Sequence, residues 1–188
     1  TLAWLDPRSA IGLSIYAQRL SPGGVASWTA GGVPVLGGAG TRGAPVAEGD
    51  GSGGVFVAWS ERRSGGYQVD VYAQHVDAGG SLTWNAIGAP AFVGVLIRDP
   101  NDGDGPPPAI LADGAGGLFA AYDRWEYLEL FQTNVAFQHL DSSGVPQLGA
   151  FGEFLCAAPL DQAGTALLPD GSGGCIAWWR DRRAADPD

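Results

Sequence analysis

The sequence contains no lysine and no methionine, and it has two cysteines and two histidines among 188 residues. Ten arginines against 20 acidic residues leave a net charge of -10, which argues against binding to nucleic-acid backbones. No apolar run approaches the roughly 20 residues that a membrane-spanning helix needs, so we expect no membrane insertion. The sequence given carries no signal peptide, and we therefore expect a mature or excised piece of a protein.

The composition also disfavours long helices. The chain has 31 glycines and 13 prolines, which together are roughly twice the share of average usage. Both residues destabilise helix interiors. Hydrophobic residues nevertheless make up 45% of the chain, which provides the apolar surface that a disordered segment lacks. We therefore expect a folded chain of short strands and turns.

One motif occurs three times along the chain. DGSGG, DGAGG and DGSGG begin at Asp50, Asp113 and Asp170, and an apolar run follows each copy. These runs read VFVAW, LFAAY and CIAWW, and the LAW segment that ends at Trp4 is a fourth copy without its glycine turn. Self-similarity at a period of about 60 residues indicates a repeat architecture.

A second motif lies between these copies. It reads IYAQRL, VYAQHV and VAFQHL, so that Gln18, Gln74 and Gln138 are in register. GGVASW and GGSLTW follow the first two copies, but Leu148 and Gly149 stand where the third unit would reach tryptophan. We divide the chain into a partial unit 1–12, repeat one 13–68, repeat two 69–132 and repeat three 133–188.

Each unit is predicted to contain four short strands. Alternating segments rich in β-branched and aromatic residues, such as VDVYAQHVD, predict strands, and Asp113 with Gly114 predicts a hairpin turn into LFAAY. VFVAW is apolar on both sides, so we expect both faces of this strand to be covered. Four antiparallel strands per unit, stacked face to face, form the blade pattern of an all-β propeller. A solenoid or a row of separate sandwiches is the alternative.

The motif set D-G-x-G-G, A-W-x-D-x-R, Y-A-Q-R/H and G-G-x-x-x-W resembles the repeats of large secreted bacterial proteins. This resemblance covers essentially all 188 residues. It implies an all-β array of propeller-type blades in an extracellular or cell-surface setting. It implies no reaction, so no catalytic residues are carried over from it.

We therefore expect a non-catalytic binding or scaffold module, not an enzyme, with a protein or a glycan as its partner. A carbohydrate-binding propeller that uses rim aromatics is the first alternative. A glycosidase-type hydrolase is the second, and it needs two carboxylates about 5 to 9 Å apart in one cleft.

Three units do not close a propeller, because closed rings typically need four to eight blades. Both ends of the chain stop at the same element, LAW before Asp6 and CIAWW before Arg180. The remaining blades are therefore expected from the same longer chain or from another subunit. We favour a fragment of a longer chain, because the first unit begins without its turn.

The polar residues of the repeat are interpreted as structural. His75 and His139 occupy equivalent positions in separate units, where they would not converge on one metal ion. Charged residues two positions apart follow the apolar strands, and one pair has its signs exchanged, which suits local ion pairs better than catalytic carboxylates. These pairs are Asp6 with Arg8, Glu61 with Arg63, Arg124 with Glu126, and Asp181 with Arg183.

The two cysteines, Cys156 and Cys175, have two interpretations. Cys175 aligns with Val55 and Leu118, which is a predicted core position of the strand. Both cysteines can be small buried hydrophobes. They can also form one disulfide across the unit, because both fall in repeat three.

Repeat two has the longest connection, RDPNDGDGPPP, which begins at Arg98. Asp99, Asn101, Asp102 and Asp104 offer side-chain oxygens of the kind that calcium prefers. Their spacing differs from that of an EF-hand loop, so a solvated acidic loop is the competing interpretation. Apart from this calcium site we expect no cofactor.

Repeat two also carries the aromatic segment DRWEYLELF, which begins at Asp123. Trp125 and Tyr127 would share one side of an extended chain, with the carboxylate of Glu126 beside them. Aromatic faces next to carboxylates can stack on sugars, so these three residues form the candidate ligand site. Packing against a neighbouring unit is the competing interpretation.

Overall fold

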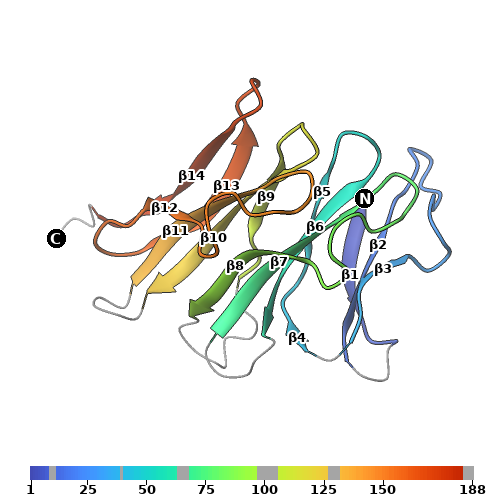
Figure 1. The fold of residues 1–188 in the computed structure, drawn as a ribbon, viewed down its shortest axis with the longest axis horizontal. Coiled ribbons are helices and arrows are strands. Elements are labelled where there is room, and N and C mark those ends of the chain that lie inside the picture. The colour runs from blue at the N-terminus through green and yellow to red at the C-terminus, as the bar shows by residue number, and fades with distance from the viewer. Residues whose placement is uncertain (9–11, 39, 63–67, 97–105, 127–131, 184–188) are drawn as a thin grey trace.

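The computed structural model describes residues 1–8, 12–38, 40–62, 68–96, 106–126 and 132–183. These residues form β-strands and no helix (Figure 1), which confirms the predicted all-β class. No helix that is both long and apolar enough to cross a membrane occurs in this part of the chain. The strands are β1 (Leu2–Asp6), β2 (Ser14–Gln18), β3 (Val33–Leu36), β4 (Thr41–Arg42), β5 (Val46–Gly49), β6 (Val55–Arg62), β7 (Gln68–Val76), β8 (Ala89–Leu96), β9 (Ala109–Ala112), β10 (Leu118–Glu126), β11 (Gln132–Leu140), β12 (Glu153–Cys156), β13 (Gln162–Pro169) and β14 (Cys175–Asp181).

Two groups of strands form complete four-stranded antiparallel units. β5, β6, β7 and β8 pair in that order and are called unit B. β9, β10, β11 and β12 pair in the same way and are called unit C. β1, β2 and β3 form unit A, and β13 with β14 forms unit D. Units B and C therefore have the four short strands that the repeat predicts.

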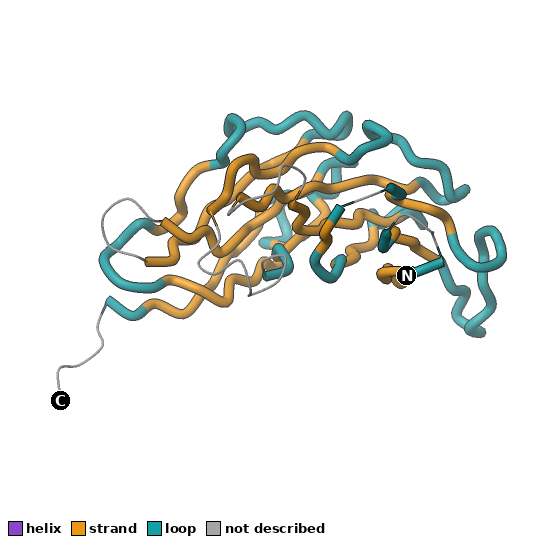
Figure 2. Tube along the Cα trace, turned by 90° about the horizontal axis from the view of Figure 1, so that it is seen from below, coloured by secondary structure: helices purple, strands orange, loops and turns teal. Residues whose placement is uncertain are grey.

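The units follow one another across the molecule from A to D (Figure 1). Figure 2 shows the strands gathered in the middle, with the turns at the strand ends. Units B and C also share one sheet, because Leu96 of β8 pairs with Trp125 of β10. The hydrogen-bonded units begin at a different phase from the sequence divisions, since the pairs β1–β2 and β6–β7 cross positions 12 and 68.

The hydrophobic core lies between consecutive units. Phe56 and Ala58 of β6 face unit C, in a cluster that includes Leu118. Val57 and Trp59 of the same strand face unit A, in a second cluster. Every residue of VFVAW is at most 1% exposed. The prediction that this strand is covered on both faces is therefore confirmed.

Tryptophans after the second motif close the contacts between units. The indole N–H of Trp28 donates to the carbonyl of Ala78, and that of Trp84 donates to the carbonyl of Ser142, each over 3.0 Å. Gly144 has a φ of 78°, and a Cβ added there would lie 2.8 Å from the indole of Trp84. Glycine is required at this turn because it accepts the left-handed conformation and lets the indole approach.

Candidate functional site

The aspartate of each D-G-x-G-G motif closes its own turn. Oδ1 of Asp50 accepts hydrogen bonds from the backbone N–H groups of Ser52 and Gly54, over 2.7 and 2.8 Å. Asp113 makes the same two bonds in unit C, and Asp170 makes them in unit D. These carboxylates therefore hold the hairpins that the motif predicts.

The second oxygen of two of these aspartates binds a histidine of the same unit. Nε2 of His75 lies 3.0 Å from Oδ2 of Asp50, and Nε2 of His139 lies 2.8 Å from Oδ2 of Asp113. The two imidazoles bind separate aspartates in separate units, as their structural interpretation requires. Each one ties the third strand of its unit to the turn before the second strand.

The electrostatic setting of these pairs favours ionised carboxylates. Burial raises the pKa of Asp50, but the hydrogen bonds from His75, Ser52 and Gly54 outweigh it, so the pKa lies below its ordinary value. The pKa of Asp113 is lowered by the same opposing causes. A general acid at neutral pH needs a raised carboxyl pKa. The shift at both positions runs in the opposite direction.

Three buried glutamines, one in each of units A, B and C, close a loop in the same way. Oε1 of Gln74 accepts hydrogen bonds from the N–H groups of His75 and Trp84, and its Nε2 donates to the carbonyl of Asn85 over 2.7 Å. Gln18 and Gln138 make the corresponding bonds. Sequence reasoning found their register but not this role. The available signal was the recurrence of a glutamine at one position of the second motif in all three repeats.

The charge pairs are confirmed at two places. Arg8 binds Asp6, and Nη2 of Arg183 lies 2.6 Å from Oδ2 of Asp181. Each arginine lowers the pKa of its aspartate. In unit D the lowering at Asp181 comes first from the Arg183 side chain.

The predicted partner of Glu61, Arg63, lies outside the described residues, so this pair stays a prediction. The structure pairs Glu61 with Arg42 of β4, over 3.0 Å and with both side chains 2% exposed. These two residues are direct cross-strand neighbours. The side chain of Glu126, the predicted partner of Arg124, also lies outside the described part.

In units A and B a further contact links the tryptophan of the apolar strand to the acid two residues later. The indole N–H of Trp4 donates to Asp6 over 2.9 Å, and that of Trp59 donates to Glu61 over 3.3 Å. Unit C has Arg124 at the acid position and Tyr122 at the tryptophan position. The donor and its acceptor are thus replaced together, which supports a structural role for the acid.

The cysteines are free, and both are half-buried. Sγ of Cys156 lies 3.8 Å from Oδ2 of Asp181, at one end of β14, whereas Cys175 begins that strand at the other end. Six residues of strand span about 20 Å, and a disulfide needs Cα atoms within about 7 Å. The structure therefore contains no disulfide between them. Cys175 packs against the cluster of Leu111, Ala121 and Leu167, as a small hydrophobe does.

The candidate ligand site is described in part. Trp125 is half-buried on β10, and its backbone pairs with Thr133 on one side and Leu96 on the other. The Glu126 side chain and Tyr127 lie outside the described residues. The shared aromatic side therefore stays a prediction.

The candidate calcium ligands Asp99, Asn101, Asp102 and Asp104 all lie outside the described residues. Within the described ranges no group of three or more His, Cys, Asp or Glu side chains could hold a metal ion. The calcium site and the competing solvated loop both stay predictions.

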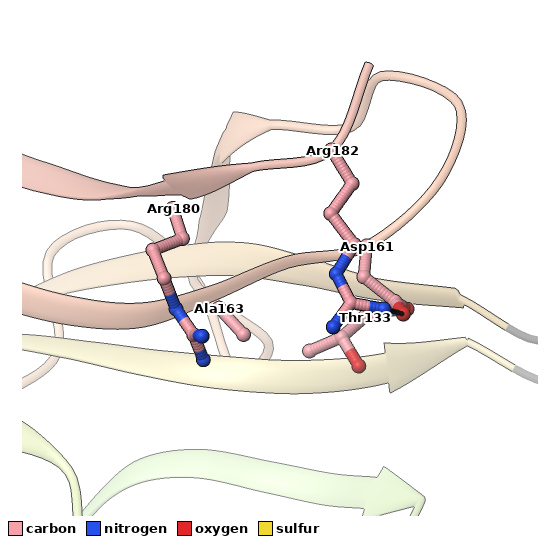
Figure 3. Close-up of a pocket in the computed structure, with 5 residues that line it drawn as sticks. All are labelled: Thr133, Asp161, Ala163, Arg180 and Arg182. Carbon is pink, nitrogen blue, oxygen red and sulfur yellow. Dashed lines mark hydrogen bonds and ion pairs between the residues drawn. The ribbon is translucent and has the colours of Figure 1, made fainter. Parts of the chain in front are cut away.

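Two hollows occur at the junction of units C and D. The smaller, about 90 Å³, is lined by Thr133, Asp161, Ala163, Arg180 and Arg182. Asp161 accepts a hydrogen bond from the backbone N–H of Thr133 over 3.0 Å and forms an ion pair with Arg182 over 3.5 Å (Figure 3). The larger hollow, about 450 Å³, is mainly apolar and includes Phe119, Phe137 and Trp179 in its wall.

Comparisons of this chain with protein-family models, with curated proteins and with solved structures found no match.

Proposed function

We propose that the chain is a non-catalytic binding or scaffold module built from propeller-type blades. The observation that carries this proposal is the use of the repeated polar side chains. The turn aspartates bind backbone N–H groups and histidines of their own unit. The buried glutamines bind the loops of their own unit. These groups stabilise the repeat and leave little of their hydrogen-bonding capacity for a substrate.

The stacking of the units supports the propeller-type arrangement. The first strands of units B, C and D lie next to one another, since β9 contacts both β5 and β13. Unit B also packs one face on unit A and the opposite face on unit C, and unit C packs on units B and D in the same way. Radial repetition of four-stranded sheets has this pattern. The missing blades would come from polypeptide outside these residues.

The proposal is tested by turnover and glycan binding measured on the same folded sample. We expect background rates on a panel of chromogenic glycosides. Turnover that falls in Asp50→Asn or Asp113→Asn would overturn the non-catalytic assignment. Glycan-array binding that is lost in Trp125→Ala would instead establish the carbohydrate-binding alternative.

A further inference from the structure

The larger hollow lies between strands β10, β11 and β12 of unit C and strand β14 of unit D. Phe119 of β10, Phe137 of β11 and Leu155 of β12 line one side. Cys175 and Ala177 of β14 line the other, together with Trp179. The rings of Phe119 and Phe137 stack with centroids 5.8 Å apart. The wall is therefore apolar, like the side chains that fill the junctions between the other units.

The repeat identifies what occupies this place in a complete unit. β14 aligns with β6, so that Cys175, Ala177 and Trp179 correspond to Val55, Val57 and Trp59. In unit B the strand β7 lies beside these three positions in the same sheet and extends their face. Residues directly opposite each other in an antiparallel pair share a face. The residues of β7 on this face are Tyr72 opposite Trp59, Gln74 opposite Val57, and Val76 opposite Val55.

The backbone of β14 is also incomplete. β6 pairs with β5 and β7, and β10 pairs with β9 and β11. Among the described strands, β14 pairs with β13 alone. A free strand edge presents a row of N–H and C=O groups to any strand that can align with it. The strand β14 therefore carries both a free edge and one wall of the apolar hollow.

We propose that the hollow and the free edge of β14 form one acceptor site for an extended polypeptide strand. The strand runs antiparallel to β14, adds to its edge by backbone hydrogen bonds, and inserts alternate side chains into the hollow. The register of β6 and β7 assigns these side chains: an aromatic residue meets Trp179, a glutamine lies opposite Ala177, and an aliphatic residue meets Cys175. This inference goes beyond the scaffold role and does not depend on it.

The described strands of this chain do not supply the added strand. The chain has three strands of the required pattern, namely β2, β7 and β11. Each of them is already paired along both edges. A second copy of this chain would have to break one of its own sheets to supply the strand. An unpaired strand from elsewhere has no such cost.

The test uses the folded chain and a labelled synthetic peptide with the sequence of residues 68–77, QVDVYAQHVD. We expect saturable one-to-one binding by fluorescence anisotropy. A control peptide of the same composition, with the apolar residues moved by one position, should bind at least about tenfold more weakly. No binding of the first peptide to the folded chain, or equal binding of both peptides, would overturn the proposal.

Two variants on adjacent residues of β14 locate the site. Ala177→Glu places a charge in the hollow and should weaken peptide binding at least about tenfold. Ile176→Glu changes the opposite, exposed face of the same strand and should leave binding unchanged. Far-UV circular dichroism checks that both variants fold. If Ala177→Glu does not fold, Cys175→Trp fills the hollow instead. Binding that Ile176→Glu removes, or that both hollow variants retain, would contradict the assigned face.

Discussion

Strands β6 and β14 carry the same motif but lie in different surroundings. Phe56 and Trp59 of β6 are fully buried, because unit B has a neighbouring unit on each face and a paired strand on each edge. Ile176 and Trp178 of β14 are 55% and 54% exposed. The apolar pattern therefore determines which faces can be buried, and the neighbouring strands and units determine whether they are.

The two strands also differ in the size of one side chain, at the position of Ala58 in β6 and Trp178 in β14. Trp178 aligns with Ala3, Ala58 and Ala121, which are small in the other units. Ala58 and Ala121 lie in closed junctions where interiors are densely packed. An indole at either position would not fit without displacement of its neighbours. Unit D thus differs from B and C in chemistry as well as in burial.

The largest expected effect is on the tryptophans that occupy equivalent positions in β6 and β14. Trp59→Ala removes a fully buried indole and should cost about 3 to 5 kcal/mol of unfolding free energy. Trp179→Ala should cost less than about half as much, because the hollow already borders its side chain. Urea unfolding measures both. Equal losses would mean that the two strands are equally well packed.

The glutamine contacts are expected to have the next largest effect. Gln74→Leu leaves two backbone N–H groups and one carbonyl of the loop without their partner, so we expect a loss of about 2 to 4 kcal/mol. Gln138→Leu should cost a similar amount, because it makes the same three bonds in unit C. Gln68→Leu, an exposed position on β7, is the matched control and should change stability by less than about 0.5 kcal/mol. A glutamine variant no worse than this control would refute the loop role.

A smaller effect is expected from pH. Asp50 and Asp113 have pKa values lowered below the ordinary 3.8, so their ionised forms stabilise the fold above that pH. This stability is lost as pH falls through the folded-state values. Unfolding followed from about pH 5 to 2 should therefore show a steeper loss for the wild type than for Asp50→Asn or Asp113→Asn. Parallel curves would show that these carboxylates do not contribute.

The smallest effect is expected at Trp125. Its side chain is half-buried, and the equivalent residues Arg62 and Arg182 are polar, so no core position for tryptophan exists there in the repeat. Trp125→Ala should change the unfolding free energy by no more than about 1 kcal/mol. A loss of several kcal/mol in urea unfolding would mean that Trp125 belongs to the core, and the rim platform would be ruled out.

The turns and central strands could be predicted because their signals are local. Asp-Gly turns and the two-sided apolar run of VFVAW indicate hairpins and a doubly covered strand without knowledge of the neighbours. The pairing of Glu61 with Arg42 could not be predicted, because it depends on the register of β4 against β6. The separation of Cys156 from Cys175 depends on the relative placement of β12 and β14.

The hollow beside β14 was harder to predict from the sequence. The pattern of β14 matches that of the core strand β6, and Cys175 is accordingly predicted at a core position. The exposure of Cys175, Ala177 and Trp179 to a hollow follows from the strand that is absent from the edge of β14, and a pattern within β14 does not report on that edge. The repeat still identifies the missing partner, because β7 and β11 occupy its place in units B and C.

Hydrogen–deuterium exchange of the amides of β6 and β14 in one sample tests the central claim most directly. Edge amides without a partner strand exchange through small local openings, whereas amides of a central strand need larger ones. We predict that the β14 amides that point to its unpaired edge exchange at least about tenfold faster than the equivalent amides of β6. The 68–77 peptide should slow this exchange. Equal protection of the two strands without the peptide would contradict the account.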